Sequence, residues 1–442
     1  MTARGAILAA AASGSGKTLI TAGLARHFRQ HGLRVATAKA GPDFVDPSYH
    51  AAATGRPCLN LDLWGMRWAT LAGLVSELEA ASDIVLCEGV MGLFDGTGPL
   101  GEEASTADLA RATGWPVVLI VDARGQGASV AALARGFATH EPNLPLAGVI
   151  FNRVSSPRHA KLLADAIARH LPALACLGAL PSDPSLTLPS RHLGLVPAGE
   201  AGENEAVIDR CSIQIAAALD VEKLLKLSRP SVFASAARAT PLPVLGQRTA
   251  IACDDAFCFA YPALLEGWRR QGAELAFFSP LANEPPDPEA DTVYLPGGYP
   301  ELWAQQLESA DGFAGGLRRA AADGKPVYGE CGGYMVLGEA LVDATGRSRR
   351  MVGLLPLVTS FAERRLQLGY RRVAMLHNNP LGPAGARFRG HEFHYATMVR
   401  QGAGNALFQA IDPAGSSLSC EGLRRGSVFG SFIHLIDRSE ER

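Results

Sequence analysis

A glycine-rich segment near the start of the chain has the composition of a phosphate-binding loop. It reads SGSGKT at 13–18 and lies between an apolar run and a helical pattern. Backbone N–H groups of such a loop bind phosphate oxygens, the lysine reaches the terminal phosphates and the hydroxyl binds Mg²⁺. The usual pattern begins with a glycine, where this chain has Ala11. We predict a nucleotide site made by Gly14, Ser15, Gly16, Lys17 and Thr18.

Acidic side chains follow the strands that we expect beside this loop. Glu88 ends a buried strand, as metal ligands do in nucleotide-binding folds, so Glu88 and Asp43 are candidates to bind Mg²⁺ together with Thr18. Asp43, Asp46 and Asp95 are candidates for the step at the terminal phosphate, although an Asp-Pro turn by itself is common. Asn152 ends another strand, where a contact to the nucleotide base and a simple strand-end cap explain it equally well.

A second reactive segment reads YGECGGY at 328–334. The glycines around Cys331 permit a sharp strand-to-helix turn that exposes the sulfur. We expect the helix N-terminus to lower the thiol pKa and to supply N–H groups to an oxyanion. PGGY at 296–299 offers a second N–H donor, and His434 offers a base. A buried structural cysteine is the commonest alternative, but this glycine setting argues against it.

Two sheets are needed to position these groups. Apolar runs alternate with helical patterns, which is typical of parallel strands buried between helices. In the first half we expect a helix at 19–31 and strands at 6–12, 34–39, 83–88, 116–122, 147–152 and 174–180. In the second half we expect strands at 248–252, 274–278, 292–295 and 326–328, and others near 351–376, 391–399 and 427–435.

The predicted fold is therefore α/β, with two doubly wound domains. Pro, Ser and Ala dominate residues 226–247, where the periodicity is lost. We interpret this segment as a linker between a phosphate-loop domain, 1–225, and a second catalytic domain, 248–442.

Composition excludes several classes of protein. The chain has 442 residues, 48% hydrophobic and 19% charged, which is typical of globular domains. A net charge of −2 gives no field to attract nucleic acid or an anionic membrane. The eight cysteines are scattered, as in reduced cytoplasmic proteins, and no apolar run reaches the ~20 residues of a membrane span. The apolar start runs directly into the phosphate loop, so we interpret it as a strand and not as a signal peptide.

Nine motifs occur in one order along the chain. They are SGSGKT at 13–18, KAGPDFVDPSYH at 39–50, GRPCLNLDLWG at 55–65, CEGVMGLFDG at 87–96, PSRHLGLVPA at 189–198, LPGGYPE at 295–301, YGECGGYM at 328–335, GHEFHYA at 390–396 and GSFIHL at 430–435. In this order they resemble the cobyrinic acid a,c-diamide synthases of corrinoid biosynthesis over essentially the whole chain. The first half is similar to the dethiobiotin synthetase-like phosphate-loop fold, and the second to class I glutamine amidotransferases.

The resemblance implies a role for each matching residue. Cys331 would be the glutaminase nucleophile, with His434 as its base and Gly298 and Gly332 at the oxyanion hole. The phosphate loop would bind ATP, Thr18 and Glu88 would bind Mg²⁺, and the carboxyl-activating step would use Asp43, Asp46 and Asp95. One position departs from other class I glutaminases, which usually have His-x-Glu, because this chain has Ile436 two residues after His434. The usual acid that orients the histidine is therefore missing, and Asp437 faces the other side of its strand from Ile436.

The implied reaction joins both sites. ATP converts a carboxylate to an acyl phosphate, and ammonia released from glutamine displaces the phosphate. The implied substrate is a corrin polycarboxylate, either cobyrinic acid or cobalt-free hydrogenobyrinic acid, amidated at its a and c acetates. Arg191 and His192 are candidate contacts to it.

Three other functions remain open from sequence alone. The first is amidation of another tetrapyrrole, as by cobyric acid synthase or a nickel-sirohydrochlorin a,c-diamide synthase. The second is a phosphate-loop switch ATPase of the chromosome-partitioning type, which the near-neutral charge and the Cys331–His434 pair disfavour. The third is a cysteine peptidase, which leaves the ATP site unexplained. We expect small-molecule substrates, no nucleic-acid or membrane partner, and leave a homodimer open.

Overall fold

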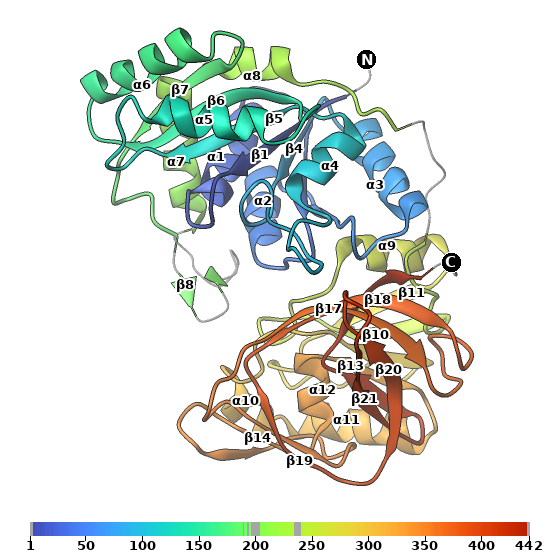
Figure 1. Ribbon diagram of the computed structural model, residues 1–442. Helices are drawn as coiled ribbons and strands as arrows, with labels where there is room; N and C mark the ends of the chain where they lie inside the picture. Colours follow the sequence, from blue (N-terminus) through green and yellow to red (C-terminus); the bar gives the residue numbers. More distant parts are fainter. Residues whose placement is uncertain (1–2, 189, 192–193, 196–203, 234–239, 440–442) are drawn as a thin grey trace. The chain divides into compact units, whose positions relative to one another are not determined.

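The computed structural model describes residues 3–188, 190–191, 194–195, 204–233 and 240–439 (Figure 1). The chain forms two compact units. Unit 1 comprises Met1–Trp64 and Trp68–Arg238, and unit 2 comprises Gly65–Arg67 and Ala239–Arg442. Each unit is described by itself.

Unit 1 contains a seven-stranded sheet in which every neighbouring pair is parallel. The strand order is β3-β2-β4-β1-β5-β6-β7. Its strands are β1 (Arg4–Ala10), β2 (Val35–Ala40), β3 (Leu59–Leu61), β4 (Ile84–Glu88), β5 (Val117–Asp122), β6 (Leu146–Val154) and β7 (Ala175–Pro181). A separate short hairpin joins β8 (Ser190–Arg191) to β9 (Gly194–Leu195). The order reverses at β1, so the loops after β1 and β4 open at one edge, where α/β proteins bind ligands.

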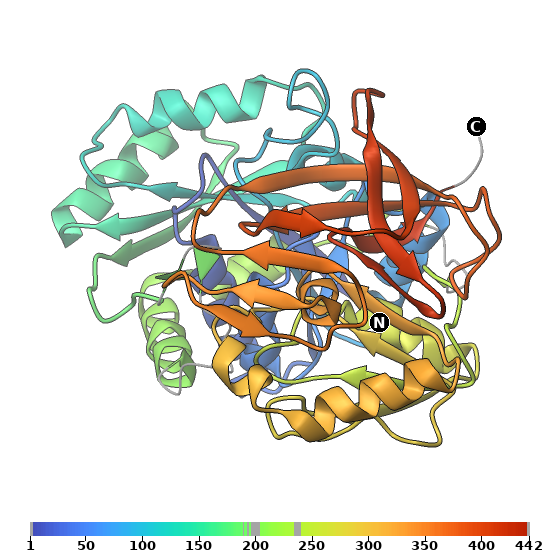
Figure 2. The same ribbon diagram turned by 90° about the horizontal axis from the view of Figure 1, so that it is seen from below.

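Helices cover both faces of this sheet. α1 and α7 contact each other on one face, and α5 and α6 contact each other on the opposite face (Figure 2). The helices are α1 (Lys17–Gln30), α2 (Asp46–Thr54), α3 (Trp68–Ala80), α4 (Thr106–Thr113), α5 (Val130–Thr139), α6 (Pro157–His170), α7 (Asn204–Ala218) and α8 (Val221–Leu227). This is the doubly wound arrangement that the sequence predicts.

All six strands predicted for the first half are present, with ends displaced by a few residues. The prediction missed β3, because three apolar residues are too few to give a periodic signal. α8 extends into the segment predicted as a linker, and beyond it Arg229 forms a backbone bridge to Gly5.

Unit 2 contains a ten-stranded mixed sheet in the order β11-β10-β12-β13-β22-β21-β20-β17-β18-β23. The pairs from β11 to β22 are parallel and the pairs from β22 to β23 are antiparallel. Its strands are β10 (Arg248–Ala252), β11 (Glu274–Phe278), β12 (Thr292–Leu295), β13 (Val327–Glu330), β17 (Gln367–Met375), β18 (Arg387–His394), β20 (Asn405–Ile411), β21 (Ser417–Arg425), β22 (Val428–Ser431) and β23 (His434–Arg438). The doubly wound prediction describes the parallel half, and the long antiparallel half adds to it.

The rest of unit 2 packs against this sheet. A four-stranded sheet contains β14 (Ala340–Val342), β15 (Ser348–Arg350), β16 (Leu357–Ser360) and β19 (Thr397–Gln401). The helices are α9 (Pro262–Arg270), α10 (Ala304–Glu308), α11 (Asp311–Ala322) and α12 (Gly332–Leu337). One apolar core joins residues of β10, β12, β13, α11 and α12. Cys331 belongs to that core, so its position is set by packing as well as by its turn.

Candidate functional site

The predicted phosphate loop connects β1 to α1. Gly14 and Gly16 have φ values of 77° and 95°, a left-handed conformation that favours glycine. A side chain at Gly16 would also approach Asn152 Nδ2 to 2.3 Å. Ala11 does not have a positive φ, so the departure from the usual pattern causes no backbone strain. The loop therefore has the geometry that phosphate binding requires.

Two residues at the end of β6 form hydrogen bonds with carbonyl groups of the phosphate loop. Asn152 Nδ2 donates to the Ser15 carbonyl at 2.9 Å, and Arg153 Nη1 donates to the Gly14 carbonyl at 2.8 Å. Because the loop carbonyls are bound on this side, the N–H groups are directed to the other side, where an anion binds. Asn152 acts here on the loop backbone. Arg153 was missed from sequence, although it directly follows Asn152.

Glu88 lies at the centre of a buried polar network beside the loop. Its Oε1 accepts a hydrogen bond from Thr18 Oγ1 at 2.8 Å, and its Oε2 is 2.7 Å from His50 Nε2. Lys39 Nζ lies 3.3 Å from Oε1. Burial by itself would raise the pKa of Glu88, but the Lys39 ammonium and the His50 hydrogen bond lower it to about 2. The carboxylate is therefore charged at neutral pH.

Lys39 links this network to the acidic loop after β2. Its Nζ donates to Asp46 Oδ2 at 2.7 Å and to the Gly89 carbonyl at 3.1 Å. Asp43 Oδ1 accepts from the Val45 N–H at 2.6 Å, in the turn before α2. Burial and the charge of Asp46 raise the pKa of Asp43 to about 7. Lys39 is the first residue of the motif at 39–50, but the sequence alone assigned it no role.

Lys17 and Asp95 both bind backbone groups of the loop after β4. Lys17 Nζ donates to the Met91 carbonyl at 2.6 Å, and burial lowers the pKa of Lys17. Asp95 is exposed, and its Oδ2 accepts from the Gly92 N–H at 2.8 Å. Asp95 therefore shapes the loop that Lys17 contacts, and it is not part of the lining of the cavity described next.

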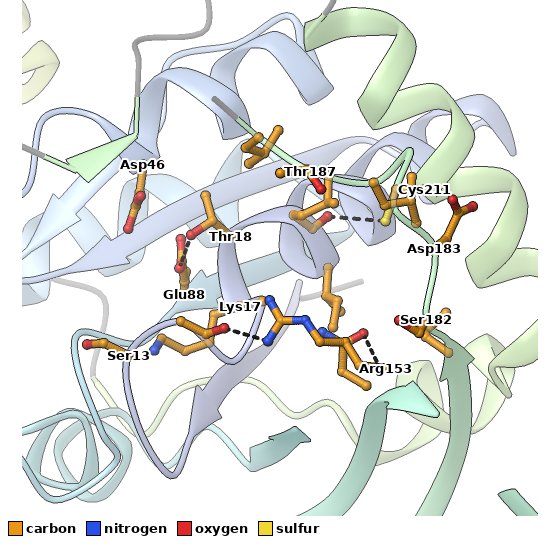
Figure 3. A pocket seen from close by; sticks show the side chains of 18 of the residues that line it. Ser13, Lys17, Thr18, Asp46, Glu88, Arg153, Ser182, Asp183, Thr187 and Cys211 are labelled. Carbon is orange, nitrogen blue, oxygen red and sulfur yellow. Dashed lines mark hydrogen bonds between the residues drawn. The ribbon is translucent and has the colours of Figure 1, made fainter. Parts of the chain in front are cut away.

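A cavity of about 670 Å³ joins these groups. Figure 3 shows Lys17, Thr18, Asp46 and Glu88 together with Ser182, Asp183 and Thr187, which come after β7 and line the same cavity. The polar and charged lining comprises Ser13, Lys17, Thr18, Lys39, Asp43, Asp46, Glu88, Arg124, Asn152, Arg153, Ser182, Asp183 and Thr187. The segment 181–188 was missed because it carries no charge pattern of its own. The size and polarity suit a nucleotide.

The residues around Glu88 fit Mg²⁺. Mg²⁺ prefers oxygen ligands and is usually bound by one or two carboxylates, substrate phosphates and waters. Thr18 Oγ1 and the charged Glu88 carboxylate provide two adjacent oxygens beside the phosphate loop. Among the residues that the structure describes, no group of three His, Cys, Asp or Glu side chains could hold a metal ion without a substrate.

The structure does not describe the side chains of the two predicted substrate contacts, Arg191 and His192. Arg191 ends β8, and only its backbone is described. His192 lies outside the described residues.

Cys331 occupies a strained turn between β13 and α12. Its φ of 44° is left-handed although it has a side chain, which is characteristic of functional turns. Neighbouring glycines make the turn sterically feasible. A side chain at Gly333 would lie 2.0 Å from the Leu295 carbonyl, and one at Gly430 would lie 2.4 Å from the Gly329 carbonyl. The predicted elbow is therefore present, with glycine required on both sides.

The structure brings Cys331, His434 and the PGGY loop together. A Cβ atom on Gly297 would lie 2.4 Å from His434 Cε1, 3.2 Å from its Nε2 and 3.3 Å from Cys331 Cβ. A Cβ atom on Gly332 would lie 3.0 Å from the Gly298 nitrogen. The amide groups of Gly298 and Gly332 thus lie close together beside the sulfur, as an oxyanion hole requires.

Two expectations about the cysteine are wrong for this structure. The sulfur is not exposed, since Cys331 has an exposed fraction of 3%. Its pKa is raised rather than lowered, because burial and the charge of Glu301 outweigh the hydrogen bond from the Gly332 N–H. α12 has only six residues, so its dipole adds little. Deprotonation therefore depends on a base.

The Asp437 carboxylate binds Arg67. The Arg67 backbone N–H donates to Asp437 Oδ2 at 2.8 Å, and Arg67 Nη2 donates to Oδ1 at 2.8 Å. Both residues belong to unit 2. Asp437 is the first acidic residue after His434 in the sequence, and its carboxylate is bound in this ion pair.

A phosphate-loop fold and a Cys–His elbow together define a nucleotide-dependent glutamine amidotransferase. Residues 6–196 match the CobQ/CobB/MinD/ParA nucleotide binding domain. Residues 248–441 match the CobB/CobQ-like glutamine amidotransferase domain.

Curated relatives extend over both units. The chain is 51% identical to hydrogenobyrinate a,c-diamide synthase of Rhizobium meliloti (strain 1021), with 99% of this chain and 100% of the relative covered. Enzymes with the same name from Brucella suis and Mesorhizobium japonicum are 49% and 47% identical over 99% of this chain, which covers 99% and 100% of them. The chain belongs to the hydrogenobyrinate a,c-diamide synthase family. No helix among its described residues is long and apolar enough to cross a membrane.

We expect Gly16→Ala to lower nucleotide affinity by more than about tenfold, because the added methyl group needs a strained φ and collides with Asn152. Isothermal titration calorimetry with ATP measures this. Gly136→Ala, at an uncrowded helix position, serves as the control and should bind ATP like the unmodified chain. Equal affinity in Gly16→Ala would contradict the assignment of the loop.

The Glu88 network predicts an acid-dependent stability. The pKa of Glu88 in the fold, about 2, lies below the ordinary value of 4.5, so ionised Glu88 stabilises the fold above pH 4.5 and this contribution is lost as pH falls towards 2. Urea midpoints measured across this range should fall less steeply for Glu88→Gln than for the unmodified chain. The exposed-residue control Glu102→Gln should follow the unmodified chain. Parallel slopes for all three proteins would show that the network does not hold Glu88 ionised.

Proposed function

We propose that this chain uses ATP and glutamine to amidate the a and c acetate carboxylates of a corrin polycarboxylate in cobalamin biosynthesis. The observation that carries the proposal is the presence of both a nucleotide cavity and a Cys–His elbow in one chain. ATP is needed because a carboxylate is a poor electrophile, and the elbow supplies the nitrogen. The full-length similarity to hydrogenobyrinate a,c-diamide synthases supports the substrate class and favours the cobalt-free corrin.

In the first step, unit 1 transfers the γ-phosphoryl group of ATP to the substrate carboxylate. The loop N–H groups from Gly14 to Thr18 bind the phosphates, and Lys17 leaves the Met91 carbonyl to neutralise the oxygens of the transferred group. Thr18 and Glu88 would hold Mg²⁺, which when bound neutralises charge on the phosphates. Asp43 and Asp46 line the side of the cavity where the carboxylate would enter, and Asp95 orders the adjoining loop.

In the second step, unit 2 releases ammonia from glutamine. His434 accepts the Cys331 proton as the sulfur attacks the carboxamide carbon, and Gly298 and Gly332 stabilise the oxyanion. Ammonia leaves, and water hydrolyses the thioester to glutamate. Ammonia then displaces phosphate from the acyl phosphate to form the amide. Burial raises the pKa of the Cys331 thiol. Near neutral pH, its attack therefore requires His434 to remove the proton.

Product mass tests the reaction directly. We expect the protein with ATP, Mg²⁺, glutamine and hydrogenobyrinic or cobyrinic acid to lower substrate mass by about two units, since each amidation removes about one unit. The faster substrate identifies the preferred metal state. No mass change with either corrin, together with ATP hydrolysis that needs no carboxylate, would contradict the proposal and favour a switch ATPase. A cytoplasmic location stays a prediction from sequence, and a homodimer stays open.

Cys331→Ser separates the two steps. We expect this variant to lose more than about 10³-fold of the glutamine-dependent rate, because the hydroxyl is a far poorer nucleophile beside the same base. The rate with ammonium chloride should stay within about twofold, since unit 1 is unchanged. Cys258→Ser, which alters an exposed cysteine, is the control. Equal loss with both nitrogen donors would show that Cys331 does not serve the glutaminase step alone.

Thr18→Val tests the Mg²⁺ assignment. The variant keeps the side-chain volume but removes Oγ1, so Mg²⁺ should no longer increase ATP affinity as it does in the unmodified chain. We expect the rate to fall about 10²-fold with glutamine and ammonia alike. Thr21→Val is a matched control, because Thr21 lies on the same helix, is fully buried and its Oγ1 has no hydrogen-bond partner among the residues that the structure describes. An unchanged Mg²⁺ effect on ATP affinity in Thr18→Val would refute the assignment.

A further inference from the structure

Glu330, the residue directly before the cysteine, approaches the catalytic histidine. It ends β13, and its exposed fraction is 2%. Its Oε2 lies 3.8 Å from His434 Nδ1. Catalytic contacts are often longer in unliganded proteins than during reaction, so this separation is compatible with a hydrogen bond in the working enzyme.

Neighbouring strands hold this carboxylate in place. Tyr294 donates its hydroxyl proton to Oε2 at 2.9 Å, and Tyr328 donates to Oε1 at 2.6 Å. The Leu435 N–H donates to Oε1 at 3.2 Å. Tyr294 pairs with Tyr328 in the sheet register, and Tyr328 precedes Glu330 by two residues, so all three side chains share one face. The two tyrosine rings are stacked at 5.6 Å.

The two sides of the His434 imidazole ring therefore face different groups. Its Cε1 and Nε2 atoms approach Gly297, next to Cys331, whereas Nδ1 faces Glu330. The His391 ring stacks on His434 at 5.1 Å and restricts rotation of the imidazole. This is the arrangement of a cysteine, a histidine and an acid in a catalytic triad.

The other ionisable groups near His434 have other contacts. Asp437, on the same strand, binds Arg67, and Glu392 binds Arg371 at 2.7 Å and His394 at 2.9 Å. His391 and His394 face His434 from β18, and each would disfavour a charged imidazole if protonated. Burial lowers the pKa of His391 to about 3, so His391 stays neutral. Glu330 is the acid whose oxygen is placed at Nδ1.

We propose that Glu330 is the positioning residue that replaces the missing His-x-Glu acid of this glutaminase site. The Nδ1–H of His434 donates to Glu330 Oε2, and Nε2 accepts the Cys331 proton. The resulting imidazolium later gives that proton to the departing nitrogen, so that ammonia leaves and the base is regenerated. This inference rests on the proposed glutaminase function of Cys331 and His434.

The environment of Glu330 fits this role. Burial raises its pKa to about 7, against the lowering effect of the two tyrosine hydroxyls and the Leu435 N–H. A buried anion beside a neutral histidine is costly, but the same anion stabilises the imidazolium that forms when the thiol is deprotonated. The Glu330 carboxylate thereby stabilises the thiolate–imidazolium pair, which counteracts in part the burial of Cys331 and His434.

Glu330→Gln tests the inference, since it keeps the size of the side chain and removes its charge. With all substrates present, we expect kcat/KM for glutamine to fall about 10²-fold, measured as glutamate released. The ammonium-dependent rate and the melting temperature should change little. In the free protein, alkylation of Cys331 by iodoacetamide should require a higher pH, and Glu330→Asp should restore part of the shift.

Asp437→Asn is the control, because it removes a carboxylate on the same strand as His434 and should leave the pH profile of Cys331 alkylation unchanged. An unchanged kcat/KM and alkylation profile in Glu330→Gln would overturn the inference. A parallel loss of ammonium-dependent rate and melting temperature, without a shift in the alkylation profile, would assign Glu330 a structural role and also overturn it. If the unmodified chain released no glutamate, the glutaminase proposal would fail, and the alkylation profile would still decide whether Glu330 acts on Cys331 through His434.

Discussion

Burying a carboxylate is unfavourable unless hydrogen-bond donors surround it, and both units of this chain place one at the end of a central parallel strand. Glu88 ends β4 in unit 1, and Glu330 ends β13 in unit 2. Both have exposed fractions of 2% or less. The donors that stabilise each carboxylate come from neighbouring elements, so the sheet must form before the charge can be accommodated. Each site therefore depends on the register of its strands.

The pKa values of the two carboxylates are shifted in opposite directions, because the neighbours of Glu88 outweigh the effect of burial and those of Glu330 do not. Cations and donors around Glu88, chiefly Lys39 and His50, overcome burial and keep it ionised, which suits a group that balances the charge of a metal ion. Among the described residues, the donors to Glu330 are two neutral tyrosines and a backbone N–H, with no lysine or arginine, so burial dominates. Its charge is then favoured only when a cation forms beside it. The same residue type at the same topological position thus serves different chemistry.

Glycine has a comparable role at both sites, because backbone must approach backbone or side chain closely. Gly16 permits the left-handed turn over Asn152, and Gly297 allows Cys331 and His434 to meet. The amino-acid composition alone does not reveal that glycine is required at these two positions. Both are visible in the order of residues, since a glycine-rich turn between a strand and a helix is the common element of phosphate loops and nucleophile elbows.

Local order in the sequence was sufficient to predict the parallel strands, the phosphate loop and the elbow, because each depends on residues close together in the chain. The same order identified Thr18, Glu88, Cys331 and His434 as site residues. Only tertiary structure decided which groups surround them. Lys39, His50 and Arg153 gain their contacts from residues 38 to 139 positions away in the sequence, and residues 182–188 reach the cavity only after β7 joins the sheet. Glu330 stands beside the cysteine in sequence, yet its distance to His434 depends on β13 and β23 meeting across 105 residues of chain, and on the packing that buries both side chains.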